Sequence, residues 1–357
     1  MNLPPPPQLV AWEITKRCKM GCVYCRASAS ATAYPGELST QKCIQIIDEI
    51  SLLGPCVLII SGGDPLLRED VFEIAKYATS KKLKVVMAVN PDTLSRDKLE
   101  QIEESGVRRI SISLDGAEQK VHDELRGVPG AFSQAKKAME LAASIRVEFQ
   151  INTTVSRYNY HQISQILDLA IKMGAKSFHP FFLVPTGRGK NLRDEEISPP
   201  DYEHILTYLA QNLEKFPLEI KATCAPHYYR ILHQQGKLPM KGEKSALRAT
   251  GCLGGISFCF ISNVGEVQPC GYLQVKAGDL KTESFGKIWN ESAIFNQLRD
   301  RGKLKGKCGI CRYRRICGGC RARAYSVSGN YLAEEPYCVY GQAASRNDLR
   351  RSLSAMA

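Results

Sequence analysis

The sequence has no long hydrophobic segment: no stretch of its 357 residues approaches the roughly 18 consecutive apolar residues that a membrane-spanning helix needs. Residues 1–13 lack a basic region followed by an apolar run, so we expect no secretory signal either. The chain also has no internal repeat. These absences favour a cytoplasmic protein that does not bind a membrane.

Acidic residues are in the minority, because 36 Asp and Glu stand against 48 Lys and Arg and give a formal net charge of +12. Such a surplus is typical of proteins that bind nucleic acid, anionic lipid, or an anionic cofactor or substrate inside the fold. The most basic run extends from Arg299 to Arg323, contains a single acid, Asp300, and is interleaved with cysteines. We therefore expect this run to compensate negative charge inside the protein, and we expect no nucleic-acid partner.

Cysteine, in contrast, is abundant for a chain without an export signal. Fourteen cysteines are present: three lie within residues 18–25, eight lie between Cys252 and Cys338, and Cys43, Cys56 and Cys224 stand apart. In a reducing cytoplasm, clustered cysteines are more often metal ligands than disulfides. We expect Cys43 and Cys56 to be buried, inert thiols.

The segment "CKMGCVYC" spaces Cys18, Cys22 and Cys25 four and three residues apart and offers no fourth cysteine nearby. A structural zinc site needs four ligands. A [4Fe–4S] cluster has four irons, so three cysteines leave one iron open to a reactant. Part of a zinc site is the alternative interpretation of the triplet alone.

Six short apolar runs alternate with helix-like segments between Leu9 and Val184. The residues from Ile163 to Ile171, for example, are apolar at helical spacing, and "STQKCIQIIDEISLLG" has Ser39 as a candidate N-cap and stops at Gly54. Six β-then-α units predict an α/β fold with a parallel sheet, and six are too few for a closed eight-stranded barrel. We predict an open partial (β/α)6 barrel with its ligand at the carboxyl ends of the strands. The predicted strands are residues 9–15, 56–61, 83–89, 107–115, 147–155 and 176–184.

The predicted domain organisation follows the change in composition along the chain. We expect one amphipathic helix behind the Pro-Pro pair at residues 199–200, and a small metal-dependent unit rich in Gly, Cys and Arg after Gly251. The predicted segments are a Pro-rich lead-in (1–8), the partial barrel (9–190), a helical bridge (191–250), the cysteine-rich domain (251–342) and a basic tail (343–357).

Three further motifs follow predicted strands: "SGGDP" at 61–65, "SISLDG" at 111–116 and "RGVPGAF" at 126–132. Together with the cysteine triplet and in this order, they resemble the radical S-adenosylmethionine (SAM) superfamily over residues 8–190. Two positions depart from the usual pattern: Asp64 stands where the family commonly has Glu, and "VNPDTL" at 89–94 replaces an Asn-Gly turn around Asn90.

This resemblance implies roles for single residues. Cys18, Cys22 and Cys25 would ligate three irons, and SAM would bind the fourth. The implied SAM contacts are Tyr24 beside the adenine, Gly62, Gly63, Asp64 and Pro65 at the methionine amine, Ser113 at the ribose, and Arg126 and Asn152 at the carboxylate or ribose.

The C-terminal cysteines are similar to the SPASM extension of radical SAM enzymes, which carries auxiliary clusters. A zinc ribbon is the alternative for two cysteine pairs with two residues between their members, Cys308 with Cys311 and Cys317 with Cys320. The resemblance implies two fully thiolate-ligated [4Fe–4S] clusters and hence three in all. One would be held by Cys252, Cys259, Cys270 and Cys320, and the other by Cys308, Cys311, Cys317 and Cys338.

A narrower resemblance extends nearly end to end. Segments such as "GGDPLLREDVFE", "KATCAPHYYRI" and "GCLGGISFCFIS" are similar to the haem synthases of the sirohaem-dependent pathway. That family implies radical decarboxylation of two propionates of iron-coproporphyrin III to vinyl groups, with electrons from a ferredoxin or flavodoxin, and we expect a monomer. The tetracarboxylate substrate favours arginine clamps. Candidate substrate contacts are Arg188, Arg230, Arg321 and Arg323, with His227, Tyr228 and Tyr229; solvated arginines and a structural histidine are the alternatives.

Three other functions remain open at this point. The chain could act on another tetrapyrrole of the sirohaem or haem d1 pathways. It could be a SPASM enzyme that modifies a peptide, although only about eight residues precede the first predicted strand. It could also be a non-catalytic iron–sulfur regulator, or a nucleic-acid binder that uses the basic run, and in either case the SAM-site residues would have no purpose.

Overall fold

The computed structural model describes residues 3–238 and 251–341. The predicted basic tail (343–357) and the end of the predicted bridge lie outside these residues. In the described part, no helix is long and apolar enough to cross a membrane.

The six predicted strands are all present, and each lies within its predicted apolar run. They pair in parallel and in chain order, and a short seventh strand, Glu219–Ile220 (β7), pairs in parallel with β6. The prediction of a parallel α/β sheet is therefore confirmed. The first six strands are β1 (Leu9–Glu13), β2 (Val57–Ser61), β3 (Lys84–Ala88), β4 (Ile110–Ser113), β5 (Phe149–Val155) and β6 (Ser177–Phe182).

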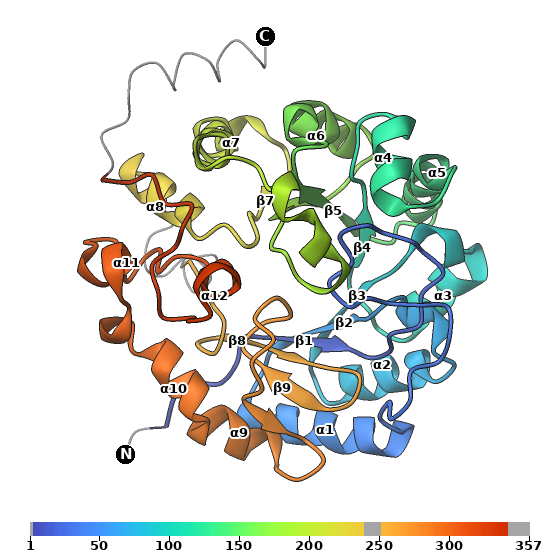
Figure 1. Ribbon diagram of the computed structural model, residues 1–357. Coiled ribbons are helices and arrows are strands. Elements are labelled where there is room, and N and C mark those ends of the chain that lie inside the picture. The colour runs from blue at the N-terminus through green and yellow to red at the C-terminus, as the bar shows by residue number, and fades with distance from the viewer. Residues whose placement is uncertain (1–2, 239–250, 342–357) are drawn as a thin grey trace.

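Helices between these strands cover one face of the curved sheet, as Figure 1 shows. Helix α1 (Thr40–Leu53) begins after Ser39, whose side chain accepts a hydrogen bond from Lys42 N, and ends at Gly54, as predicted. The other helices of this part are α2 (Val71–Ser80), α3 (Arg96–Glu104), α4 (Gln119–Arg126), α5 (Ala131–Ser144) and α6 (Ile163–Lys172).

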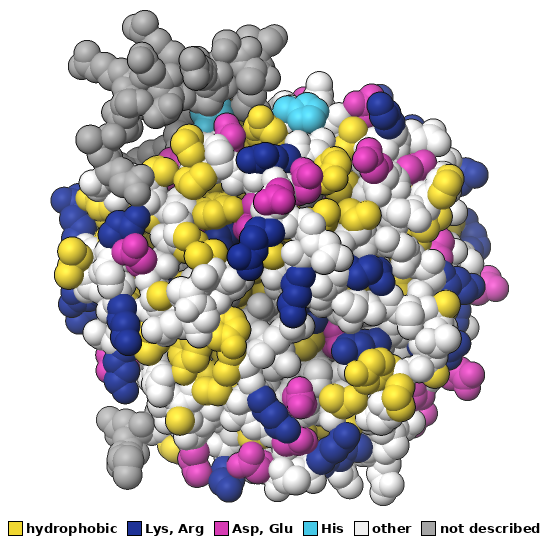
Figure 2. All heavy atoms as spheres, viewed as in Figure 1, with side chains coloured by type: hydrophobic (Ala, Val, Ile, Leu, Met, Phe, Trp, Pro, Cys, Tyr) yellow, Lys and Arg dark blue, Asp and Glu magenta, His cyan; other side chains and the backbone are white. Residues whose placement is uncertain are grey.

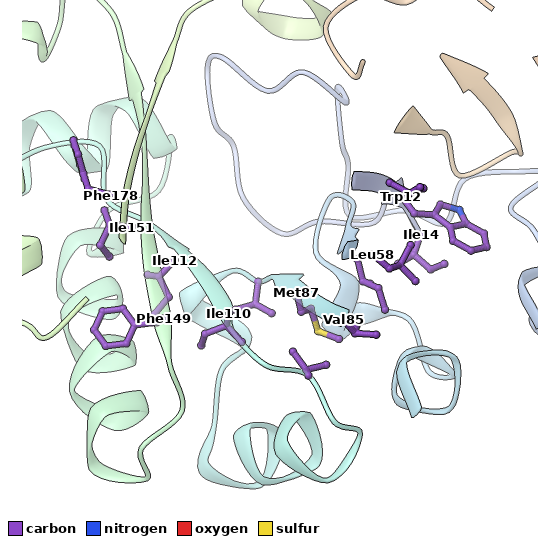
Figure 3. Packing of buried hydrophobic residues seen from close by; sticks show 14 of the residues in the cluster. Trp12, Ile14, Leu58, Val85, Met87, Ile110, Ile112, Phe149, Ile151 and Phe178 are labelled. Carbon is purple, nitrogen blue, oxygen red and sulfur yellow. The ribbon is translucent and has the colours of Figure 1, made fainter. Parts of the chain in front are cut away.

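Side chains alternate between the two faces of the sheet, as the two-residue period of a strand requires. On β1, Val10 and Trp12 belong to the apolar core beneath the helices, whereas Leu9 and Ala11 line a cavity on the other face. Figure 3 shows the core layer, in which Leu58, Val85 and the side chains of later strands continue the row begun by Trp12.

The segment that joins the barrel to the C-terminal region is partly helical. The expected amphipathic helix is present as α7 (Pro199–Gln211), which begins at the Pro-Pro pair behind the N-cap Ser198, and α8 (His227–Gln234) follows. Short 3-10 turns flank these helices: η4 (Gly187–Glu195) precedes α7, and η5 (Leu213–Lys215) follows it.

The C-terminal region continues the sheet, because β8 (Phe258–Ile261) pairs in parallel with β1. Two antiparallel strands extend it further, β9 (Glu266–Gln268) and β10 (Gly278–Asp279), so the strand order is β10-β9-β8-β1-β2-β3-β4-β5-β6-β7. In Figure 1 the orange and red helices of this region lie on the left of the view, and the lowest of them packs beside α1. These helices are α9 (Phe285–Glu291), α10 (Ala293–Arg299), α11 (Gly306–Ile310) and α12 (Arg321–Ser328).

Figure 2 shows that Lys and Arg side chains on one face are interspersed with acidic ones and do not form a single positive patch. The most deeply buried cations lie in the C-terminal region, where Arg321 and Arg323 are 1% and 0% exposed. Part of the positive surplus is therefore inside the fold, as predicted for the basic run.

Candidate functional site

A cavity of about 720 Å³ occupies the face of the sheet that the helices do not cover. It is lined by inward side chains of β1 to β6, by the loop after β1, by the segment after β7 and by parts of the C-terminal region. Seven cysteines reach it: Cys18, Cys22, Cys25, Cys224, Cys252, Cys270 and Cys320.

The predicted triplet forms one wall of this cavity. Hydrogen-bond donors point at its sulfurs: Asn90 Nδ2 and Met20 N lie 3.0 and 3.4 Å from Cys18 Sγ, and Ala29 N lies 3.5 Å from Cys25 Sγ. Such donors stabilise metal-bound thiolates. Burial raises the pKa of Cys22 to about 11, and Arg126 opposes that effect. The thiolate form of this site therefore requires nearby positive charge.

The two glycines after β2 allow the cysteine loop to pack against the strand end. A Cβ atom on Gly62 would lie 2.4 Å from the Thr15 carbonyl oxygen, and one on Gly63 would lie 2.4 Å from that of Arg17 and 2.8 Å from Cys18 Cβ. Gly63 N also donates a 2.8 Å hydrogen bond to Thr15 O. These glycines are needed for close approach of two protein segments, in addition to any contact with a ligand.

Asp64 and Pro65, which the resemblance places at SAM, do not line the cavity. The Asp64 carboxylate is fully buried and accepts hydrogen bonds from Thr93 Oγ1 at 2.6 Å and from Leu66 N at 3.2 Å. Burial raises the pKa of Asp64 to about 6. The side chain thus caps the 3-10 turn η1 (Pro65–Leu67) and ties it to the turn η2 (Pro91–Thr93).

Two other predicted SAM contacts, Tyr24 and Arg126, belong to one hydrogen-bond network at the cavity wall. Arg126 donates to Tyr24 Oη and to Asn90 Oδ1, both at 3.0 Å, and its guanidinium lies 3.8 Å from Asp115. Tyr24 donates to the same Asp115 carboxylate. Asp115 was not predicted; its position at the end of the "SISLD" strand is the available sequence signal. Ser113 and Asn152 are register partners on β4 and β5 and line the same cavity.

Arg188 lines the cavity and also holds the cysteine loop in place. Its Nε and Nη1 donate to the carbonyl oxygens of Cys22 (3.0 Å) and Ala29 (2.6 Å). Its Nη2 is buried and makes no hydrogen bond within the described residues. The preceding residue, Gly187, has φ +60°, and a Cβ there would lie 2.5 Å from the Cys25 carbonyl oxygen. The Nη2 group of Arg188 is therefore left for a ligand.

Most of the other predicted substrate contacts lie away from the cavity. Arg230 pairs with Glu203, and Arg321 donates to three carbonyl oxygens and toward Cys308 Sγ. Arg323 donates to the carbonyl oxygens of Cys224 and Leu183. Clamping by these arginines is thus not what the geometry favours, because their protein partners already hold them.

The aromatic candidates after Cys224 divide in the same way. Tyr229 lines the cavity, but Tyr228 and His227 are buried outside it. The His227 ring packs edge-on against Tyr202 with 5.0 Å between centroids, and burial lowers its pKa well below the usual value. His227 is therefore neutral, and neither ring nitrogen has a hydrogen-bond partner among the described residues.

Of the first predicted auxiliary set, Cys252, Cys270 and Cys320 line the cavity, whereas Cys259 does not. Burial, and next the nearby Cys252 and Cys320, raise the pKa of Cys270 to about 12. Cys259 is fully buried in the apolar core, where burial and then Cys56 raise its pKa. The structure thus brings three of the four predicted ligands together.

The second predicted set lies around α11. Burial is the main cause of the raised pKa of Cys317, and the nearby Cys308 and Cys338 raise it further. Backbone N–H groups donate to the sulfurs of Cys308 (3.3 Å) and Cys317 (3.4 Å). Tyr313 N donates to Cys311 Sγ at 3.4 Å. Arg230 and Arg321, predicted as substrate clamps, lie beside this set and supply positive charge.

These donor sets fit iron–sulfur clusters. They consist of thiols with N–H groups aimed at the sulfurs and arginines nearby, which is the environment that stabilises anionic thiolate clusters. Within residues 3–238 and 251–341, no three His, Cys, Asp or Glu side chains surround a single ion position. A four-iron cluster does not need that arrangement, because each of its thiolates binds a different iron.

Three comparisons with known proteins agree with this geometry. The family model of the radical SAM superfamily matches residues 12–170, and that of an iron–sulfur cluster-binding domain, SPASM, matches residues 252–320. A protein of Methanosarcina barkeri named "AdoMet-dependent heme synthase" is 47% identical over 94% of this chain and 97% of its own length. A protein of Oleidesulfovibrio alaskensis with the same name is 44% identical over 95% and 91%. The crystal structure of Streptococcus suis SuiB bound to S-adenosylmethionine superimposes with a TM-score of 0.74 at 16% identity, over 94% of this chain and 77% of that one.

Proposed function

The chain belongs to the AdoMet-dependent haem synthase family of the radical SAM superfamily, and from that premise we propose that it decarboxylates two propionates of iron-coproporphyrin III to vinyl groups, which gives haem b. The observation that carries the proposal is the 47% identity over 94% of the chain, which spans both the barrel and the cysteine-rich region. The chain is an enzyme, and its SPASM region supports iron–sulfur clusters besides the one at the SAM site.

We propose that Cys18, Cys22 and Cys25 hold the SAM-site cluster and that the C-terminal cysteines hold two auxiliary clusters. When bound, these groups supply a 5′-deoxyadenosyl radical from SAM and a one-electron acceptor. Tyr24, Arg126 and Asn90 form the wall against which SAM would lie, together with Gly62, Gly63, Ser113 and Asn152.

Each proposed turnover balances as a two-electron oxidation of the substrate, in which one electron leaves with a hydrogen atom and the other leaves the resulting radical. The propionate loses one hydrogen atom from its β-carbon, the bond to the carboxylate breaks, carbon dioxide leaves, and the remaining electron leaves as the carbon–carbon double bond forms. Two propionates therefore consume two SAM molecules. A ferredoxin or flavodoxin would supply the electrons that start each cycle.

The chain contributes positioning and shielding to this reaction. The cavity volume of about 720 Å³ is within the usual range for small-molecule sites. The Nη2 group of Arg188, which has no hydrogen-bond partner among the described residues, lies beside the cysteine loop and suits a carboxylate of SAM or substrate. Tyr229 lines the cavity, so we retain it as a second substrate contact. The buried Arg230, Arg321 and Arg323 are better suited to stabilise the cysteine-rich region than to bind substrate.

Anaerobic incubation of the reconstituted protein with iron-coproporphyrin III, SAM and a low-potential reductant tests the proposal. Mass spectrometry should detect products lighter by one and then two HCOOH equivalents, with one 5′-deoxyadenosine formed per decarboxylation. Cys22→Ala should form neither product, whereas Cys43→Ala, which alters a buried thiol of α1 that does not line the cavity, should form both.

The same assay separates the other interpretations. SAM cleavage without change to iron-coproporphyrin III, but with change to sirohaem or didecarboxysirohaem, would redirect the proposal to another tetrapyrrole. Absence of SAM cleavage in a fully loaded protein would favour a non-catalytic regulator. The likeness to SuiB shows the fold alone, so it gives no support to a peptide substrate.

A further inference from the structure

Cys259 lies on the face of β8 opposite the cavity. Its chain neighbours Phe258 and Phe260 line the cavity, whereas Cys259 and Ile261 are fully buried in the core beneath the helices. This alternation is the ordinary two-residue period of a strand. The Cys259 side chain therefore points away from Cys252, Cys270 and Cys320.

The register of β8 fixes this orientation. Val10 of β1 is the partner of Cys259, and it is likewise a fully buried core residue. A slip of one residue would turn Cys259 toward the cavity, but it would also place Phe258 and Phe260 in the core and move Ile261 out of it. The pairing of four consecutive residues with β1 opposes such a slip.

Cys224, in contrast to Cys259, lies beside Cys270 and Cys320. It follows β7 at the carboxyl edge of the sheet, lines the cavity, and packs in the same small apolar cluster as Cys270 and Cys320. The Cys224 and Cys320 side chains lie close enough for their thiols to interact. With Cys270 also close, three thiols therefore lie together at the wall of the cavity.

The backbone at Cys224 is held in an unusual conformation. Its φ of +57° lies in the left-handed region, which residues other than glycine seldom adopt. Two donors hold its carbonyl oxygen: Arg323 Nη1 at 3.1 Å and Tyr202 Oη at 3.2 Å. Arg323 is fully buried and is the third residue of α12, whose N-cap residue is Cys320. The helix that carries Cys320 thus also fixes the backbone that directs the Cys224 side chain.

We propose that Cys224, and not Cys259, completes the ligand set of Cys252, Cys270 and Cys320 for the auxiliary cluster nearer the SAM site. This inference rests on the proposed function only in assuming that the chain carries auxiliary clusters. The sulfur donors then come from four separate places in the sequence, and the cluster joins the end of the barrel to the C-terminal region.

Iron content and EPR spectra of four variants test the assignment. Reconstituted wild-type protein, Cys259→Ala and the control Cys43→Ala should each carry about twelve irons, four per cluster. Cys224→Ala should carry about eight, or should keep the iron but yield the EPR signal of a three-iron cluster after mild oxidation, because an iron without a thiolate ligand is lost first. Cys252→Ala should match Cys224→Ala and serves as the positive control.

The outcomes are distinguishable. Full iron in Cys224→Ala without a three-iron signal would overturn the assignment. If Cys259→Ala also loses iron, Cys259→Val decides: restored iron means that Ala left a cavity in the core, and continued loss means that the sulfur itself is required and the assignment is wrong. Wild-type protein with about four irons would overturn the assignment together with the auxiliary clusters. Wild-type protein with full iron but no haem product would contradict the proposed function alone.

Discussion

The side-chain amide of Asn90 donates a 3.0 Å hydrogen bond to the sulfur of Cys18, while its carbonyl oxygen accepts a 3.0 Å hydrogen bond from Arg126. Asn90 therefore joins the cysteine loop to the cationic wall of the cavity. It belongs to "VNPDTL", the segment in which the sequence departs from the Asn-Gly turn typical of the superfamily.

Asn90→Ala should make the SAM-site cluster harder to reduce. Loss of a hydrogen bond to a metal-bound sulfur removes about 1 kcal/mol of preference for the more negative state, or roughly 40 mV for one electron. Redox titration followed by EPR measures this shift. The control Asn296→Ala, which alters a surface asparagine of α10, should leave the potential unchanged, and an equal potential in both variants would refute the role.

Gly63→Ala should prevent normal loading of the SAM-site cluster. The added Cβ would lie 2.8 Å from Cys18 Cβ and 2.4 Å from the Arg17 carbonyl oxygen, so the loop must shift at a cost of about 1–3 kcal/mol. Iron should fall by up to about four per chain, and SAM cleavage should fall with it. Gly286→Ala is the matched control, since its nearest contact would be an ordinary 3.7 Å. Full SAM cleavage in Gly63→Ala would show that the close packing is not required.

Arg188→Lys should weaken SAM or substrate binding by roughly tenfold, the equivalent of one charge-assisted hydrogen bond. The planar guanidinium of Arg188 donates to Cys22 O and Ala29 O through two nitrogens and presents its third nitrogen to a ligand. The ammonium group of a lysine cannot reproduce this geometry. Equilibrium binding of SAM and of iron-coproporphyrin III to the loaded protein identifies which ligand is affected. Arg193→Lys, on the exposed side of the same η4 turn, should bind both normally.

Cys317→Ala should uncouple SAM cleavage from product formation. Cys317 is buried beside Cys308 and Cys338, so its loss should destabilise the outer auxiliary cluster but leave Cys18, Cys22 and Cys25 intact. We expect 5′-deoxyadenosine to exceed carbon dioxide, because the substrate radical has no oxidant. A parallel fall of both products would instead indicate that this cluster serves to hold the region folded.

Acid should destabilise the protein through His122. Burial lowers the pKa of His122 from 6.5 to about 4, and its Nδ1 accepts a hydrogen bond from Asp115 N. Between these two pKa values the unfolded chain binds the proton more tightly, so stability present above pH 6.5 is lost as the pH falls toward 4. The loss should reach about 2 kcal/mol at pH 5.

His122→Asn keeps a hydrogen-bond acceptor but does not titrate, so urea unfolding of this variant should depend less on pH between 7 and 5. His161→Asn, which alters an exposed ring on the η3 turn (Tyr160–Gln162), should retain the wild-type dependence. Identical pH profiles for His122→Asn and wild-type protein would contradict the prediction.

Local patterns were sufficient to predict the strands, the ends of α1 and the cysteine loop. The apolar runs of the strands and the helix cap at Ser39 depend only on residues close together in the sequence. Three cysteines within eight residues also lie near one another regardless of how the rest of the chain folds. The side on which Cys259 lies could not be predicted in this way. The segment "FCFI" is apolar throughout, so its sequence has no alternation that distinguishes the core face from the cavity face.

Long-range contacts account for the other differences. The tetracarboxylate substrate suggested that arginines clamp its carboxylates. The carbonyl oxygens that hold Arg321 and Arg323, however, come from loops whose approach no local pattern reveals. The Asp64 carboxylate likewise faces the turns η1 and η2. Donors in these turns satisfy its hydrogen-bonding capacity, so it does not need a ligand as a partner. Cys224 is separated by 96 positions from Cys320 in the sequence (320 − 224), so only the fold brings the two thiols together.

The parallel pairing of β1 with β8 also has a consequence for synthesis of the chain on the ribosome. Leu9 pairs with Phe258, so the flank of β1 stays an unpaired strand edge until about 250 further residues have emerged. Contacts so distant in sequence form slowly. The cysteine loop after β1 is thus synthesised early, whereas β8, which pairs with the edge of β1, is synthesised late. Iron delivered before that time would meet a nascent sheet with an open edge, so we expect productive loading to follow completion of the C-terminal region.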